Sequence, residues 1–269
     1  MVTSKAVVLG IACAGWLLQR MCKSGRYSPT GTHFVVPATA GASTACARCW
    51  LTWTRSAWDH FRGFAAAWHV PAGASTAQSG QWVPGPGAEL FSAVQRGLGG
   101  LPFIAEDLGL ITPDVCALRD HFCVPGTRVL QFAFDGHSDN PYLPDNYIPN
   151  TVVYTGTHDN PTTREWYEEL PSAQRRSFWY YLRRPEGRSS DAATASMQLA
   201  WPSAAALAIA PLQDVLNLGT EARMNVPGRA EGNWRWRCPE DMLSTPQIEW
   251  LRDLTKSSDR SGVFRARLG

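Results

Sequence analysis

The sequence predicts an α/β fold in which parallel strands alternate with helices, as they do in part of a (β/α)8 barrel. Between residues 101 and 218, short apolar runs alternate with segments of helical spacing, and this alternation is typical of a parallel sheet covered by helices. Polar residues recur directly after the apolar runs. Because barrel proteins carry their chemistry at the carboxyl ends of the strands, these polar positions are the first candidates for a functional site.

The clearest unit covers residues 101–122. Residues 101–105 are all apolar except for a proline, which predicts a short strand buried on both faces. Glu106 and Asp107 follow where this strand ends. A Thr-Pro-Asp sequence at 112–114 then begins a helix, since Thr caps helices, Pro suits the first turn and Asp suits the positive end of the helix dipole. The predicted inner face of this helix consists of Val115, Leu118 and Phe122. A solvated acidic loop is the alternative interpretation of the two carboxylates.

The remaining elements follow from the same patterns. Strands are expected at 128–134 and 151–155, and the second strand leads into the polar sequence Gly-Thr-His-Asp-Asn at 156–160. Helices are expected at 88–97, 172–184 and 192–199. Loops are expected at 70–87 and 141–149, which are rich in Gly and Pro. An apolar stretch at 204–218 contains Gln213 and Asp214.

Charge divides the chain into dissimilar parts. The net charge of +2 argues against a surface that binds nucleic acid, and we expect no nucleic-acid partner. Residues 1–57 contain six basic residues and no acid, whereas the remainder contains 19 basic and 23 acidic residues. We therefore predict an atypical N-terminal segment at 1–57, a folded part at 58–256 and a polar tail at 257–269.

The N-terminal segment has three open interpretations. Residues 6–18 are mostly apolar, but this run is too short to span a bilayer, and no membrane partner is expected. The run is similar to the core of a signal peptide, while the absence of acids also fits an organelle transit peptide. The third interpretation is that residues 1–57 are not a native reading frame of the protein.

The cysteines predict neither a disulfide framework nor a metal site. Seven cysteines are scattered through a long chain, and an odd scattered set does not suit paired bridges. Cys46 and Cys49 have the spacing of half a zinc site or of a redox pair, but no second pair follows at a suitable distance and no βαβ pattern surrounds them.

Several motifs, in order along the chain, resemble one enzyme family. They are WDHFRGF (58–64), FIAEDLG (103–109), VLQFAF (129–134), YTGTHDN (154–160), PLQDVLNLG (211–219), ARMNVPG (222–228) and GNWRWR (232–237). Together they resemble the 4-α-glucanotransferases, the amylomaltases or disproportionating enzymes of glycoside hydrolase family 77. The resemblance covers about residues 59–252 and implies about strands 4–8 of a (β/α)8 barrel.

The resemblance implies a catalytic set of three carboxylates. Asp59 matches the nucleophile after strand four, Glu106 the general acid/base after strand five, and Asp159 the carboxylate after strand seven that stabilises the transition state. A retaining mechanism of this kind uses two carboxyl groups about 5–5.5 Å apart. The implied reaction transfers a 1,4-α-glucan segment between maltooligosaccharides or glucans derived from starch or glycogen. The resemblance implies no cofactor and no metal. It also implies a location in the cytoplasm or the plastid stroma.

The same resemblance implies a set of sugar contacts near the acceptor groove and the reacting bond. These substrate-binding candidates are Arg62, His158, Asn225, Trp234 and Arg235, with Trp236 beside them. For His158, a structural loop histidine is the alternative. Because most tryptophans in any domain lie in the core, we assign four others to packing: Trp166, Trp179, Trp201 and Trp250.

The sequence also departs from the family pattern. Ala57 stands two residues before Asp59, where the family has an Arg that pairs with the catalytic carboxylates. Pro161 replaces an Asp, and Asp145 replaces a His. From Asp59 to the end, 211 residues remain, whereas a closed barrel takes about 250. We therefore expect a fragment with little activity by itself, and two alternatives remain open: an impaired glucan-binding remnant and a related retaining α-glucan hydrolase.

Overall fold

A computed structural model describes residues 56–243 and 245–260 of the chain. The apolar run at 6–18, the Cys46–Cys49 pair and most of the predicted segments 1–57 and 257–269 lie outside the described residues. The described residues form two compact units, 56–127 and 128–260, and the boundary falls within a strand.

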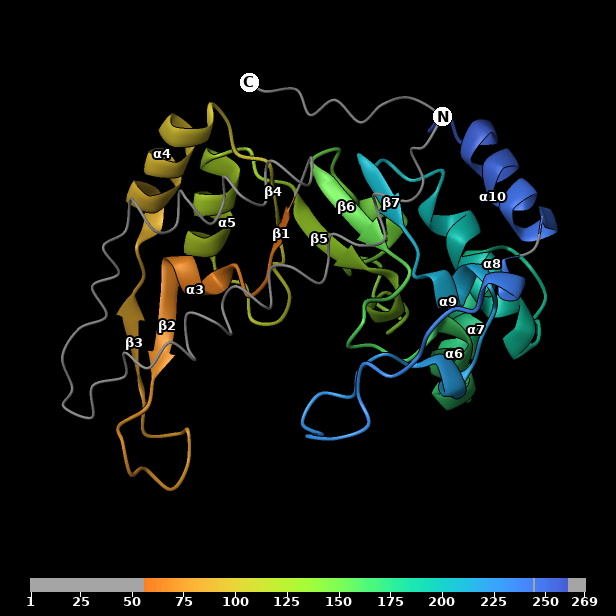
Figure 1. Cartoon of the computed structure of the whole chain (residues 1–269), viewed down its shortest axis with the longest axis horizontal. Helices are drawn as coiled ribbons and strands as arrows, with labels where there is room; N and C mark the ends of the chain where they lie inside the picture. Colours follow the sequence, from red (N-terminus) through yellow and green to blue (C-terminus); the bar gives the residue numbers. More distant parts are fainter. Residues whose placement is uncertain (1–55, 244, 261–269) are drawn as a thin grey trace. The chain divides into compact units, whose positions relative to one another are not determined.

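The first unit is built on three short parallel strands. These are β1 (Ser56–Trp58), β4 (Phe103–Ala105) and the start of β5 (Gly126–Val129). In Figure 1, β1 and β4 run beside each other, with Trp58 opposite Ala105, and Ala105 in turn lies opposite Gly126. Because β1 and β4 end at the same level, the residues that follow them emerge at the same edge of the sheet.

Helices cover this small sheet. They are α3 (Arg62–Ala65), α4 (Gly87–Leu98) and α5 (Pro113–His121). The last two confirm the predicted helices. The buried core contains Phe61, Leu90, Phe91, Val94, Phe103, Ala105, Val115 and Val124. Leu118 and Phe122 pack against it, so the predicted inner face of α5 is also confirmed.

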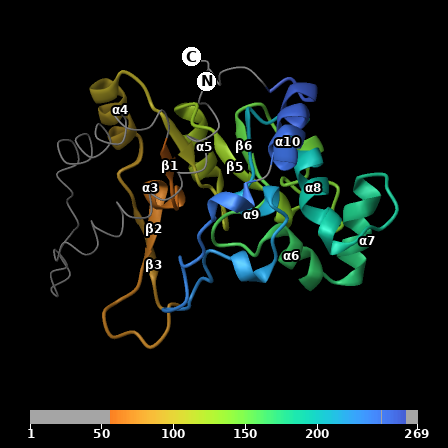
Figure 2. The same cartoon turned by 45° about the vertical axis from the view of Figure 1, so that its right-hand side comes forward.

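Two antiparallel strands form a hairpin where a loop was predicted. They are β2 (Ala66–His69) and β3 (Gln81–Pro84), which Figures 1 and 2 show from two sides. The prediction of a loop over 70–87 is therefore wrong for β3. Trp68 lies opposite Trp82 in the pairing, with ring centroids 5.3 Å apart. Such a cross-strand aromatic pair stabilises a hairpin in spite of the surrounding Gly and Pro.

The second unit combines two parallel strands with five helices. The strands are β6 (Thr151–Tyr154) and β7 (Leu207–Ile209). The α-helices among the described residues are α6 (Thr163–Glu169), α7 (Ser172–Tyr181), α8 (Ser189–Ala200), α9 (Leu212–Val215) and α10 (Thr245–Ser257). The predicted strand at 151–155 and the predicted helices at 172–184 and 192–199 are confirmed, although α7 ends before residue 184.

One local prediction in this unit needs correction, and one helix was missed. The run at 128–134 is not one strand, because β5 ends at Val129 and a 3-10 turn, η1 (Leu130–Phe132), follows. The cause is a tertiary contact, since Gln131 turns inward and its amide donates to the carbonyl of Pro161, 3.0 Å away.

Three further 3-10 turns among the described residues are η2 (Pro144–Asn146), η3 (Thr220–Ala222) and η4 (Glu240–Met242). Helix α6 was not predicted.

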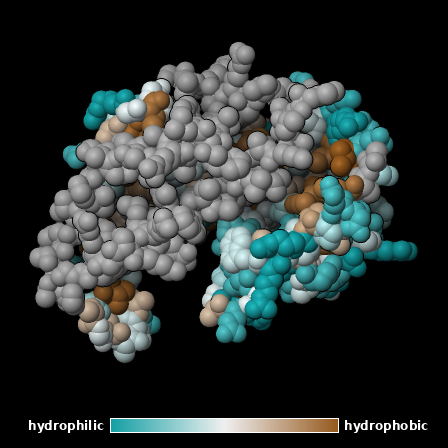
Figure 3. Space-filling model, viewed as in Figure 1, coloured by the Kyte–Doolittle hydropathy of each residue, from teal (hydrophilic) through white to brown (hydrophobic). Residues whose placement is uncertain are grey.

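The tryptophans assigned to packing do pack. Trp166, Trp179 and Trp201 are buried, and Trp250 is partly buried against the core cluster that contains Val153 and Met197. Hydrophilic side chains cover much of the visible surface of the second unit in Figure 3. Among the described residues, no helix is both long and apolar enough to cross a membrane.

Candidate active site

Asp59 and Glu106 come together in the first unit because of the strand pairing. Each directly follows one of two residues that lie opposite each other, Trp58 and Ala105. The backbone N–H of Glu106 donates to the carbonyl of Trp58, 2.9 Å away, and the N–H of Phe61 donates back to the carbonyl of Glu106 at 2.9 Å. These bonds continue the pairing of the two strands for one further residue.

The carboxyl group of Glu106 is suited to hold a proton near neutral pH. Burial is the largest influence and raises its pKa to about 7. The backbone N–H of His60 donates to its Oε2 at 2.6 Å and opposes this rise, whereas the charge of Asp59 and a side-chain hydrogen bond with Asp59 increase it. A hydrogen bond between two carboxyl groups needs a proton on one of them. The raised pKa assigns that proton to Glu106.

The second acidic residue of this loop, Asp107, has a structural role. It is 3% exposed, pairs with Arg119 at 2.5 Å and accepts from the backbone N–H of Thr127 at 2.7 Å. Helix α5 is thereby tied to the start of β5. A solvated acidic loop is excluded, because Asp107 is buried and Glu106 is half-buried.

Arg62 makes its contacts within the protein. Its side chain is 8% exposed and donates to the carbonyl of Leu110 at 2.8 Å and to the hydroxyl of Thr112 at 2.9 Å. Its guanidinium also lies 4.0 Å from the ring centroid of Trp82. Thr112 occupies the predicted N-cap position of α5, but its hydroxyl donates to Asp114 and makes no capping bond to the backbone. A contact between Arg62 and a substrate stays a prediction.

A second group of predicted site residues lies in the second unit. Asp159 accepts a hydrogen bond at Oδ1 from the side-chain amide of Asn225, 2.5 Å away. The Nε2 atom of His158 is 3.3 Å from the same oxygen, and the ring of His158 stacks against that of Trp234 with centroids 5.2 Å apart. Asp159 remains half exposed. Within the part of the chain that the structure describes, its Oδ2 atom has no partner.

The loop that carries His158 and Asp159 is fixed at both ends by Asp214. This buried carboxylate accepts from the hydroxyl of Thr155 at 2.5 Å, at the end of β6. It also accepts from the backbone N–H and the hydroxyl of Thr163, at 2.9 and 2.6 Å, at the start of α6. Burial raises the pKa of Asp214. Sequence reasoning noted Asp214 but gave it no role, although an acid inside an apolar stretch is a usable signal for a buried hydrogen-bonding group.

Trp234 is presented by a loop with its own hydrogen bonds. The side chain of Asn233 accepts from the N–H of Val226 at 2.9 Å and donates to the carbonyl of Arg229 at 2.9 Å. The N–H of Trp234 donates to the carbonyl of Met224 at 2.7 Å. Arg235 is exposed and makes no hydrogen bond or ion pair with another described residue, so its sugar contact stays a prediction.

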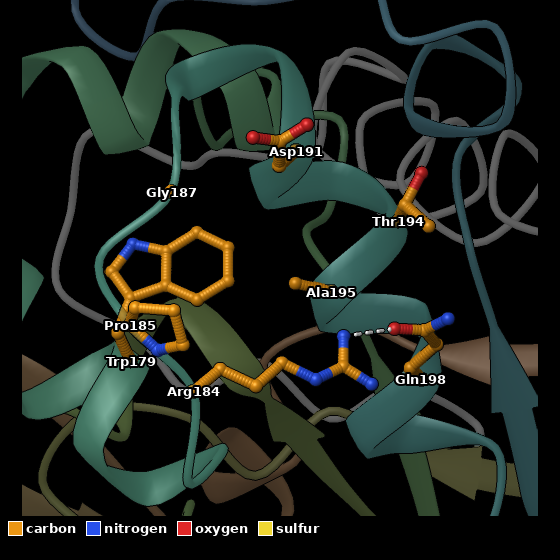
Figure 4. Close-up of a pocket in the computed structure, with 8 residues that line it drawn as sticks. All are labelled: Trp179, Arg184, Pro185, Gly187, Asp191, Thr194, Ala195 and Gln198. Carbon is orange, nitrogen blue, oxygen red and sulfur yellow. Dashed lines mark hydrogen bonds between the residues drawn. The ribbon is translucent and has the colours of Figure 1, made fainter.

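A cavity of about 360 Å³ lies beside α7 and α8 in the second unit, and none of the predicted site residues lines it (Figure 4). It is lined by Trp179, Arg184, Pro185, Gly187, Asp191, Thr194, Ala195 and Gln198. Arg184 donates to Gln198 at 2.7 Å, and Trp179 is only 4% exposed. Because Arg184, Pro185 and Asp191 are exposed, the cavity opens at the surface beside the two helices.

Known proteins similar to this chain fall in one family. Residues 56–243 match the family model described as 4-alpha-glucanotransferase. The chain is 48% identical over 210 residues to the 4-alpha-glucanotransferase of Thermus thermophilus and 50% identical over 197 residues to that of Synechocystis. These matches cover 75% and 72% of this chain but 41% and 37% of the relatives. The chain thus spans about 40% of their length.

Solved structures agree with the sequence matches. The amylomaltase from Streptococcus agalactiae, solved in complex with acarbose, is similar with a TM-score of 0.76 and 30% identity. The match covers 82% of this chain and 44% of that one. The predicted fold class, an α/β part of a (β/α)8 barrel, is confirmed.

Proposed function

We propose that this chain, which belongs to the 4-alpha-glucanotransferase family, carries catalytic residues for transfer of 1,4-α-glucan segments by a retaining double displacement. The observation that carries the proposal is the carboxyl pair of Glu106 and Asp59, in which Glu106 holds a proton near neutral pH. The first step of retaining glycoside chemistry requires one protonated and one ionised carboxyl group, about 5–5.5 Å apart, on the two sides of the bond that breaks. Residues 58–256 are proposed as the part of the chain that belongs to this catalytic domain.

In the first step, Glu106 donates its proton to the glycosidic oxygen while an oxygen of Asp59 attacks the anomeric carbon. The bond to the leaving sugar breaks, and a covalent glucosyl ester forms on Asp59. Glu106 is left ionised beside a carboxyl group that is no longer charged, so the part of the rise in its pKa that came from the charge of Asp59 is removed, while the larger effect of burial remains.

In the second step, ionised Glu106 removes a proton from the hydroxyl group of an acceptor sugar. The acceptor oxygen attacks the anomeric carbon, the ester to Asp59 breaks, and a new glycosidic bond forms with the original configuration. Asp159 is proposed to stabilise the positive charge that develops on the sugar ring in both steps.

The proposed substrates are maltooligosaccharides and glucans derived from starch or glycogen. The acarbose in the Streptococcus agalactiae amylomaltase supports a glucan-like ligand for this family. His158, Asn225, Trp234, Arg235 and Arg62 are proposed sugar contacts. For Trp234, 44% exposure of a ring stacked on His158 supports that role, because an apolar ring face can pack against a sugar.

The proposed location is the cytoplasm or the plastid stroma. The relatives from Arabidopsis thaliana and Solanum tuberosum are named chloroplastic/amyloplastic, which supports the plastid for a plant-type member of the family.

A maltotriose assay tests the proposal in a chain to which a normal N-terminal half of the family, including the Arg that Ala57 replaces, has been restored. We expect glucose and longer maltooligosaccharides to form while the number of reducing ends stays constant, because each bond broken is remade. Glu106→Gln and Asp59→Asn should each lower the rate by several orders of magnitude, since each removes an obligatory step. Glu89→Gln makes the same chemical change at an exposed position of α4 and is the control.

Each alternative predicts a different result in that assay. A related retaining hydrolase gives a steady rise in reducing ends. An impaired remnant binds maltotriose without redistributing its chain length. Unchanged turnover in Glu106→Gln contradicts the catalytic assignment itself.

A further inference from the structure

We propose that Arg223 and Glu165 are positioning residues, which hold Asn225 against Asp159 and so aim the Asp159 carboxylate. The inference rests on the proposed function, because that function assigns Asp159 to stabilising the transition state. It adds two residues to which the family resemblance gave no role.

Arg223 joins two segments that are far apart in the sequence. Its Nη1 atom lies 3.3 Å from Oε1 of Glu165, and its Nε–H donates to the backbone carbonyl of Asn225 at 3.2 Å. The two charged side chains are 19% and 6% exposed, so solvent screens their attraction only in part. The backbone of Asn225 is thereby held, and its side chain is placed to donate to Asp159 at 2.5 Å.

Glu165 is also bound to the loop that contains Asp159. Its Oε2 atom accepts from the backbone N–H of Thr162 at 3.3 Å, and its own N–H donates to the hydroxyl of Thr162 at 3.3 Å, which together form a capping box. Thr162 ends the loop. The contacts therefore close a ring that runs from Asp159 through Asn225, Arg223, Glu165 and Thr162 back to Asp159.

This ring of contacts determines which oxygen of Asp159 is free to face a substrate. Oδ1 receives Asn225 and lies 3.3 Å from His158, whereas Oδ2 has no partner within the part of the chain that the structure describes. If the ring opens, the carboxylate is free to rotate. A misplacement of about 1 Å at a reacting group can cost on the order of 100-fold in rate.

Helix α6 supplies a matched control. Arg164 and Glu168 form a second ion pair on the same helix, also at 3.3 Å, but their side chains are 41% and 48% exposed. Exposed pairs contribute little to stability, and this one does not contact the loop. Gln can replace Glu in a capping box, so Glu165→Gln keeps the helix start while removing the charge. Arg223→Lys keeps the charge but cannot reproduce the two-nitrogen fork of Arg.

The experiment uses the full chain labelled with ¹⁵N, in which the side-chain amide signal of Asn225 is assigned from its loss in Asn225→Asp. We expect the amide proton, shifted downfield by its bond to Asp159, to move upfield in Glu165→Gln and in Arg223→Lys. It should stay in place in Glu168→Gln and Arg164→Lys. In the maltotriose assay, the first two variants should lose about 10- to 100-fold in kcat with little change in KM, and the controls should lose neither.

An unchanged Asn225 signal in Arg223→Lys would overturn the positioning proposal. This test does not depend on Glu165→Gln, which can be left out if that variant does not fold. A chain with the N-terminal half restored that transfers no glucan contradicts the proposed function instead. The amide signal then still decides the positioning question, since it needs no turnover.

Discussion

At the scale of single residues, the chemistry of Glu106 depends on a few neighbouring atoms. The N–H of His60 favours its ionised form, while burial and the charge of Asp59 favour the protonated form and prevail. Part of this was predictable from the sequence, because two residues that follow adjacent parallel strands must emerge at one edge. The opposing bond from His60 was not, since it depends on a left-handed backbone at a non-glycine residue, with φ of 53°.

The pH dependence of kcat/KM should report this environment. Glu106 must be protonated in the free enzyme, so we expect kcat/KM for maltotriose to fall as the pH rises through about 7. The stability of the fold should depend on pH in the same direction. The contribution of Glu106 to stability is complete below the pKa of an unfolded glutamate, near 4.5, and is lost as the pH rises through about 7. A rate that falls only below pH 5, with no loss near 7, would contradict the assignment of the acid.

Ala57 allows a gain-of-function test at the same site. Ala57→Arg places a cation within β1, two residues before Asp59, which follows the strand. A nearby cation favours ionised carboxylates, so we expect the pH limit of kcat/KM to move below about 7. We also expect turnover to rise, by about tenfold if the nucleophile is aimed better. Ala88→Arg, at an exposed position, is the control, and equal effects in the two variants would contradict the prediction.

At the scale of elements, the sequence predicted the helices and strands whose formation depends on residues close together in the chain. The strands β4 and β6 and the helices α4, α5, α7 and α8 follow from apolar spacing and from residues near their own ends. The hairpin of β2 and β3 and the turn η1 were missed because distant partners determine them. Helix α6 could have been found, since Thr162 and Glu165 form a capping-box sequence. The contact of Arg223 with Glu165 spans 58 residues and has no local signal.

Asp214 should stabilise the loop between β6 and α6. Asp214→Asn replaces one acceptor oxygen with an amide that faces donors, and we expect it to lower the free energy of unfolding by about 2 kcal/mol. It should also lower turnover, because the loop carries Asp159. Thermal and urea unfolding measure the change, with Asp253→Asn at an exposed position of α10 as the control. Equal stability of the two variants would show that the hydrogen bonds of Asp214 contribute nothing to the free energy of unfolding.

At the scale of the whole molecule, the chain is an α/β segment that spans about 40% of the length of its relatives from Thermus thermophilus and Synechocystis. The sequence predicted the fold class because strands alternate with helices along the chain and the seven family motifs occur in order. It did not predict where each charged side chain is buried. Asp107 and Asp214 are both acids that follow or interrupt apolar runs, yet both are buried and hold neighbouring elements together by hydrogen bonds, whereas Glu106 faces a second carboxylate.

The most direct test of the central claim, that Asp59 is the nucleophile and Glu106 the acid/base, is to trap the glycosyl ester. The Glu106→Gln chain is incubated with α-maltosyl fluoride, digested and analysed by mass spectrometry. Fluoride leaves without a proton, so the first step should proceed, whereas the second step lacks its base and should stall. We predict a maltosyl group on the peptide that contains Asp59, and none in Asp59→Asn. A maltosyl group on another residue, or none on the Glu106→Gln chain, would contradict the account.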